Sequence, residues 1–249
     1  MTQNNAIYYN NYAANSQYLN TAATLFRKES GISRDKYRAM KVKRLIHACV
    51  LARTAAGTAV FDPYLIDSLA QNGIAVPKAD FIFITHGHFD HFSPSDIKPF
   101  LKDGTVIICP ENLRPACERL APVTETPVGL RVTAVPAYNI GKPFHKKVDG
   151  GLGYIIDDGE SSLYVAGDTD LTSEVKAVRC DICALPVGGT YTMDASEAAQ
   201  AAGCIMPRIA IPTHYGDIDS VAGSRAAEEF ASLLPQSVRC DIFPPLKAE

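Results

Sequence analysis

The sequence lacks any apolar stretch that approaches the roughly 20 residues required of a membrane-spanning helix. Its first 20 residues are rich in asparagine and tyrosine and do not contain the apolar core of a secretory signal. An excess of positive charge is also missing, because the formal net charge of the 249 residues is −3. These absences disfavour both a membrane and a nucleic acid as partners.

Paired cysteine motifs are scarce. The seven cysteines are an odd number and are scattered through apolar runs. One CxxC pair, Cys180 and Cys183, lies in a run typical of a buried strand, and no second CxxC accompanies it. A zinc knuckle is therefore not expected. Such cysteine usage is typical of a reduced compartment, and we expect a cytoplasmic protein.

The chain has no Pro/Gly/Ser-rich linker and no repeat of fixed period that would divide it. Charge does change along it, because the first 44 residues carry eight of the 24 Lys+Arg and two of the 27 Asp+Glu. We expect an N-terminal extension over residues 1–40, either a solvated leader or a basic arm for an anionic partner. One domain over residues 41–249 would follow it.

Short runs of β-forming residues alternate with helix-like segments from about residue 41. A hairpin is predicted for the two runs Val42–Arg53 and Thr58–Asp62, which flank the turn residues Ala55-Ala56-Gly57. Further buried strands are predicted at 81–84, 105–109, 131–135, 153–157, 163–166, 181–185 and 209–212. Helices are predicted at 95–101, 111–120, 195–206 and 222–234. The pattern predicts an α/β domain with buried sheets.

The chain contains only six histidines, and half of them lie together. His86, His88 and His91 fall within six residues, with Asp90 among them, directly after the apolar run at 81–84. Polar groups at the end of a buried strand cost free energy unless something binds them. Imidazole and carboxylate are ligands for zinc, manganese and iron. The segment therefore predicts a metal site rather than a histidine-rich surface loop.

Two more predicted strands end in candidate ligands. The run at 163–166 leads to Asp168, and the run at 209–212 leads to His214. Taken alone, Asp168 could belong to an ordinary Gly-Asp-Thr turn, and His214 could be a core histidine. Because functional groups gather beyond the carboxyl ends of strands, their joint placement predicts one convergent site.

This order of motifs resembles the signature of the metallo-β-lactamase superfamily, over about residues 41–245. The motifs are His-x-His-x-Asp-His, a later histidine, Gly-Asp-Thr and a final histidine. His47-Ala-Cys resembles the Gly-His-Ala or Gly-His-Ser of small stand-alone hydrolases, including the ascorbate-6-phosphate lactonase-like branch, with Ile46 in place of the glycine. The resemblance implies a four-layer αβ/βα sandwich with the site at one edge of two packed sheets.

The resemblance also implies two divalent metal ions, most readily zinc, with manganese or iron as alternatives. The implied ligands are His86, His88 and a later histidine for one ion, Asp90, His91 and His214 for the other, and Asp168 as a bridge. We assign the later histidine to His145. Family members often carry it nearer the strand end, where this chain has Asn139, and an amide is a poor ligand for zinc.

Four further features would support the metals or the substrate. Asp62 resembles the family's early strand-end aspartate, which supports the metal loop from behind. His47 is the one histidine left unassigned, and its reach to the site stays open. Tyr191 lies with two glycines before a helix start, where backbone N–H groups would hold an anion unless the segment is a plain turn. Lysines 142, 146 and 147 surround His145 and would attract an anionic substrate, unless they are merely solvated.

These residues imply a metal-dependent hydrolase of a small molecule. Two ions that share a water lower its pKa from 15.7 towards 7, and the resulting metal-bridged hydroxide would cleave an ester, lactone or phosphodiester. Asp90 would orient that water and pass its proton on. The alternatives are a nuclease on the same fold, which the acidic body of the chain disfavours, and a metal-binding sensor without catalysis, which the intact ligand set disfavours.

Overall fold

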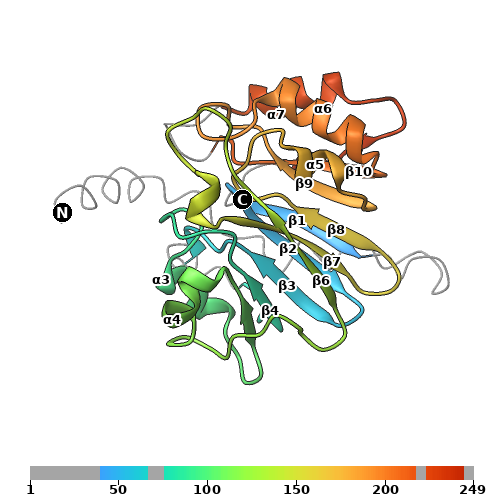
Figure 1. The fold of residues 1–249 in the computed structure, drawn as a ribbon. Coiled ribbons are helices and arrows are strands. Elements are labelled where there is room, and N and C mark those ends of the chain that lie inside the picture. The colour runs from blue at the N-terminus through green and yellow to red at the C-terminus, as the bar shows by residue number, and fades with distance from the viewer. Residues whose placement is uncertain (1–39, 67–75, 217–222, 244–249) are drawn as a thin grey trace, which may run out of the picture.

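Two β-sheets lie face to face at the centre of the molecule (Figure 1). The computed structural model describes residues 40–66, 76–216 and 223–243. The first sheet, in the order β1-β2-β3-β4-β5, contains β1 (Lys41–Ile46), β2 (Cys49–Thr54), β3 (Gly57–Phe61), β4 (Phe81–Phe83) and β5 (Val106–Ile108). The second, in the order β11-β10-β9-β8-β7-β6, contains β6 (Arg131–Pro136), β7 (Leu152–Asp157), β8 (Ser162–Val165), β9 (Ile182–Pro186), β10 (Ile209–Thr213) and β11 (Arg239–Cys240).

Three buried apolar clusters separate four layers. The middle cluster fills the space between the sheets, where the rings of Phe61 and Phe83 stack with centroids 4.5 Å apart and Phe83 contacts Tyr154. The second sheet is covered by α5 (Ser173–Ala177), α6 (Ala195–Ile205) and α7 (Arg225–Leu233) (Figure 1). The first is covered by α3 (Pro94–Ile97) and α4 (Arg114–Cys117), with the 3-10 turns η1 (Lys98–Phe100) and η2 (Glu111–Leu113). The predicted αβ/βα sandwich is confirmed.

The predicted hairpin is wrong in one respect. The run Val42–Arg53 is two antiparallel strands, β1 and β2, which are joined by a turn at His47-Ala48. The run contains no glycine, proline, asparagine or aspartate that would mark a turn. The turn depends instead on His47, whose φ of 48° is left-handed. The region is therefore a three-stranded meander with β3.

The other predicted strands correspond to β4–β10, and the two C-terminal helices correspond to α6 and α7. The helices predicted at 95–101 and 111–120 are shorter than expected, because each contains a proline, Pro99 or Pro115, and part of each is a 3-10 turn. The extension at 1–40 lies outside the described residues except for Met40. Within the described ranges, no helix has the length and apolar character needed to cross a bilayer.

Strand direction brings the candidate residues to one edge. In the first sheet β3, β4 and β5 run parallel, and in the second sheet β8, β9 and β10 run parallel. Asp62 follows β3, the segment 84–91 follows β4, Asp168 follows β8 and His214 follows β10. The carboxyl ends of both sets of strands therefore deliver side chains to the same place.

Candidate metal centre

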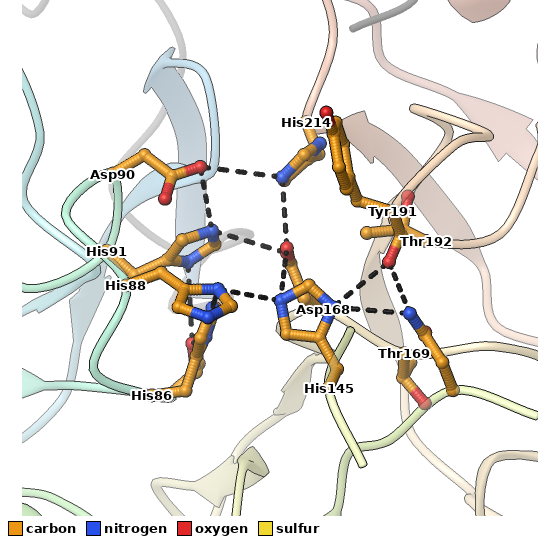
Figure 2. A network of polar contacts seen from close by, with 12 residues as sticks. His86, His88, Asp90, His91, His145, Asp168, Thr169, Tyr191, Thr192 and His214 are labelled. Carbon is orange, nitrogen blue, oxygen red and sulfur yellow. Dashed lines mark hydrogen bonds and ion pairs between the residues drawn. The ribbon is translucent and has the colours of Figure 1, made fainter. Parts of the chain in front are cut away.

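Three imidazoles from two loops form the first part of the site (Figure 2). The Nδ1 atom of His88 lies 3.1 Å from Nε2 of His86 and 2.9 Å from Nε2 of His145. His86 and His145 are buried, whereas His88 is exposed. The three nitrogens therefore converge on a point that opens to solvent beside His88.

The tautomer of His145 is set by the loop behind it. Its Nδ1–H donates to the backbone oxygen of Tyr191 at 3.1 Å, so Nε2 keeps its lone pair towards His88. The side-chain amide of Asn139 donates to the same Tyr191 oxygen at 2.7 Å, and its backbone N–H donates to the His145 oxygen at 2.8 Å. Asn139 thus holds the loop, and His145 is the side chain that reaches the other two imidazoles.

Asp168 connects this group to a second one. Its Oδ2 lies 3.4 Å from Nε2 of His145 and 3.0 Å from Nε2 of His214, and its Oδ1 lies 3.3 Å from Nε2 of His91. Asp90 completes the second group, with Oδ2 3.6 Å from His91 Nε2 and 3.7 Å from His214 Nε2. Figure 2 shows Asp168 between the imidazoles of both groups.

Asp62 lies behind the metal loop and is fully buried. It accepts hydrogen bonds from the backbone N–H of Thr85 at 2.8 Å and from its hydroxyl at 2.7 Å. The Nδ1–H of His91 donates to Asp62 Oδ2 at 2.8 Å. Asp62 therefore fixes both the backbone of the loop and the ring of His91, whose Nε2 is left to face the site.

His47 reaches the site. Its Nε2 lies 3.1 Å from Oδ2 of Asp90, and its ring centroid lies 4.2 Å from that of His214. Burial, together with the charge of His214, lowers the pKa of His47 to about 3. The uncharged ring can donate its Nε2–H to Asp90, which orients the carboxylate beside His91 and His214.

Arg44 is a supporting residue that the sequence analysis did not single out. It is buried, donates to the His47 oxygen at 2.8 Å and the Tyr215 oxygen at 2.6 Å, and lies 4.0 Å above the Tyr215 ring. It thereby ties the β1–β2 turn to the segment after β10. Arg44 directly follows Lys43 in the run Lys41–Ile46, and nothing in that pattern separates it from an exposed arginine.

The imidazoles of the site differ in the direction in which their pKa values are shifted. Burial holds the pKa of His86 well below its ordinary value and also lowers that of His145. Burial acts in the same direction on His91, but the carboxylates of Asp168 and two further aspartates outweigh it and raise the pKa of His91 to about 10. Burial would raise the pKa of Asp168, yet the neighbouring imidazoles hold it well below the ordinary value. Negative charge is thus concentrated around one imidazole.

Several buried atoms at the centre make no hydrogen bond within the described part of the chain. They include Nε2 of His91, Nε2 of His214 and Oδ1 of Asp168. Buried polar atoms are nearly always satisfied in native proteins. Imidazole nitrogens and carboxylate oxygens are the ligands that divalent ions accept. The donor set therefore fits bound metal.

Two of the three lysines expected to attract an anion are held in ion pairs, whereas Lys146 is exposed. Lys142 donates to Asp170 and to the Thr192 oxygen, both at 2.6 Å, and Lys147 pairs with a glutamate at 2.7 Å. In the loop before α6, the N–H of Gly189 donates to the Met193 oxygen at 3.0 Å. The segment that carries Tyr191 therefore contains a hydrogen-bonded turn, and the binding of an anion by its other N–H groups stays a prediction.

Comparison with known proteins identifies the family. Residues 41–214 match the model of the beta-lactamase superfamily domain. A UPF0173 metal-dependent hydrolase from Koribacter versatilis is 32% identical over 205 residues, which cover 74% of this chain and 88% of that protein. A second from Methanoregula boonei is 30% identical, with 82% and 94% of the two chains covered.

A solved structure agrees with these relatives. A candidate metal-dependent hydrolase from Parabacteroides distasonis is 31% identical, and its structure superposes with a TM-score of 0.66 over 82% of this chain and 92% of that one. The family match, the fold and the ordered His/Asp motifs all agree. The chain belongs to the beta-lactamase superfamily and, within it, to the UPF0173 metal-dependent hydrolases.

Proposed function

We propose that this protein is a binuclear metal-dependent hydrolase of a small molecule. The observation that carries the proposal is the position of Asp168, whose two oxygens lie between histidines of both groups. His86, His88 and His145 would hold one divalent ion, and Asp90, His91 and His214 would hold the other, with Asp168 shared. Zinc suits this donor set best, and manganese or iron would also fit.

Bound there, a pair of divalent ions supplies a water of lowered pKa and polarises the bond under attack. The chain itself supplies position and proton transfer. Asp90 would accept a proton in the reaction, and the Nε2–H of His47, 3.1 Å from its Oδ2, keeps the carboxylate oriented. Asp62 and the Tyr191 oxygen fix the rings of His91 and His145 from outside the site.

The bond cleaved is proposed to be an ester, a lactone or a phosphodiester. The test is a screen of all three substrate types with zinc- and manganese-loaded protein, beside metal-free protein and the Asp90→Asn variant. We expect turnover that needs both the metal and Asp90. Loaded protein that cleaves none of the three would instead favour a metal-binding sensor.

A nuclease is the alternative within the same reaction type. Two of the three lysines near His145 are already paired with carboxylates, Lys142 with Asp170 and Lys147 with Glu174, which disfavours a phosphate backbone as the ligand. Activity on single-stranded DNA or RNA above that on small phosphodiesters would favour the nuclease.

A further inference from the structure

Exposed apolar side chains are concentrated on the two loops that carry His88 and His145. Four of the eight large apolar side chains that are exposed in the described chain lie on the two loops that carry His88 and His145. They are Phe89, Ile140, Phe144 and Val148, with exposed fractions of 62%, 62%, 43% and 88%. Exposed apolar groups that cluster, rather than scatter, mark a surface that binds something.

Two of these side chains form aromatic pairs, one beside each group of candidate ligands. The ring of Phe89 lies 6.1 Å from that of Tyr64, which in turn lies 5.6 Å from His47 on the Asp90 side. The ring of Phe144 lies 5.0 Å from that of Tyr191, whose backbone oxygen holds His145. Each pair is thus anchored to a residue that supports the metal site.

Charge at the same opening is largely compensated. Lys142 is held by Asp170 and by two backbone oxygens, and Lys147 is held by Glu174. Lys146 is the exposed cation that remains beside His145. A surface of this kind suits an uncharged, apolar group better than a phosphate or carboxylate.

We propose that the site hydrolyses neutral esters whose acyl chain is apolar, and that Phe89 and Phe144 hold this chain at the opening. The proposal rests on the hydrolase function proposed above and narrows its substrate class. In the reaction, the acyl carbon gains the hydroxyl of water, its bond to the alkoxy oxygen breaks, and the alcohol leaves with the proton. The chain would lie between the two aromatic pairs while the ester group faces His88.

The first test measures binding without turnover. Acetohydroxamate and octanohydroxamate share one metal-binding head and differ by six methylenes, and both are titrated into zinc-loaded protein by calorimetry. Partial burial of the longer chain is expected to give about 10- to 100-fold tighter binding of octanohydroxamate. Phe89→Ser and Phe144→Ser should each lower that ratio at least threefold.

Val128→Ser is the matched control, since Val128 is 91% exposed and precedes β6 at the end away from the site. It should leave the ratio unchanged. Equal affinity for the two hydroxamates, no binding of either, or a ratio that both phenylalanine variants preserve would overturn the proposal.

The second test compares turnover of p-nitrophenyl octanoate, p-nitrophenyl acetate and bis(p-nitrophenyl) phosphate. We expect the highest kcat/KM for the octanoate, and a preference for the charged diester would overturn the proposal. Selective hydroxamate binding with no cleavage of these substrates or of the lactones in the screen above would instead refute the hydrolase function and leave the apolar binding surface standing.

Discussion

Four residues of the site are held in a left-handed backbone conformation that non-glycine residues seldom adopt. Six non-glycine residues in the described chain have a positive φ, and four of them are His47, Asp62, His145 and His214. Such a conformation costs of order 1–3 kcal/mol per residue and persists only where surrounding contacts impose it. Four of the six positive-φ residues belong to the site, which indicates that conformational stability is lost there in order to orient these side chains towards one point.

His145 and Asn139 make the sharpest comparison between neighbouring residues. His145→Ala removes the third imidazole beside His86 and His88, so we expect one metal equivalent fewer and loss of nearly all activity. Asn139→Ala removes a hydrogen bond to the Tyr191 oxygen but no nitrogen from the group, so both metals should stay. Elemental analysis of the two purified variants measures the metal content of each. Equal metal content in both would refute the assignment of His145 as the third imidazole ligand.

Asp90→Asn tests the group proposed to accept a proton. The amide keeps the shape and can still accept from His47, but it loses the charge beside His91 and His214. Turnover should fall about 10²-fold or more, the usual scale for a general base, with an unchanged far-ultraviolet circular dichroism spectrum. A folded variant with full turnover would remove Asp90 from the mechanism.

His91 predicts a pH dependence of metal binding. The surrounding carboxylates raise its pKa to about 10, so in metal-free protein at pH 8 this imidazole carries a proton that a metal must displace. Burial lowers the pKa of His47 to about 3 and also lowers those of His86 and His145, so these rings are already uncharged. Metal affinity should therefore weaken as the pH falls from 10.

Calorimetry in two buffers of different ionisation enthalpy measures this displacement. At pH 8 we expect the release of about one proton or more per chain on metal binding. Zinc binding at pH 8 without proton release would contradict the electrostatic account of the site.

At the scale of elements, close backbone approach fixes where the ligand loops lie. A Cβ added to Gly188, which follows β9, would lie 2.7 Å from Nδ1 of His214 and 2.8 Å from its backbone oxygen. Gly188→Ala must therefore displace His214, and we expect about a 10²-fold loss of turnover with weaker binding of the second metal. The measurements are steady-state kinetics and zinc titration.

Gly203→Ala provides the matched control on α6. An added Cβ there has one neighbour, a Pro235 carbon at 3.9 Å, and alanine favours the helix. This variant should keep full activity with equal or higher stability. Equal activity in the two alanine variants would mean that His214 is not constrained by the β9 loop.

Elements with strong local signals were predictable from the sequence, and those that depend on distant contacts were not. Apolar runs predicted β4–β10, and α6 begins at Ala195 as predicted, behind a capping box formed by Asp194 and Glu197. The His47 turn has no local signal, because its carbonyl is held by Arg44 and by the N–H of His214, far along the chain. Short elements such as α5 and β11 also lack a distinct pattern.

In the site, too, features with a local sequence signal were predictable and features that depend on distant contacts were not. Ordered motifs predicted which histidines and aspartates come together, because parallel strands deliver their carboxyl ends to one edge. The contact of His47 with Asp90 and the pairing of Lys142 with Asp170 depend on loop paths that no spacing encodes. Sequence therefore predicted the convergent groups better than the surface around them.

At the scale of the molecule, the site joins the two halves of the sandwich. The first sheet supplies the segment 84–91 and Asp62, and the second supplies Asp168 and His214, with His145 on the loop between β6 and β7. Contacts of Asp168 with His91 and of His214 with Asp90 cross from one sheet to the other. Two bound ions would therefore connect both sheets at one edge. The number of metal ions per chain is thus the property that tests this arrangement of the whole fold.

Metal content per chain is the most direct test of a binuclear centre. Protein purified without chelators and supplied with zinc, manganese or iron is desalted, and metal and protein are quantified by elemental and amino-acid analysis. The seven converging side chains offer more donors than one tetrahedral ion can use, so we expect two equivalents per chain. A value that stays at or below one equivalent after metal addition would contradict the account.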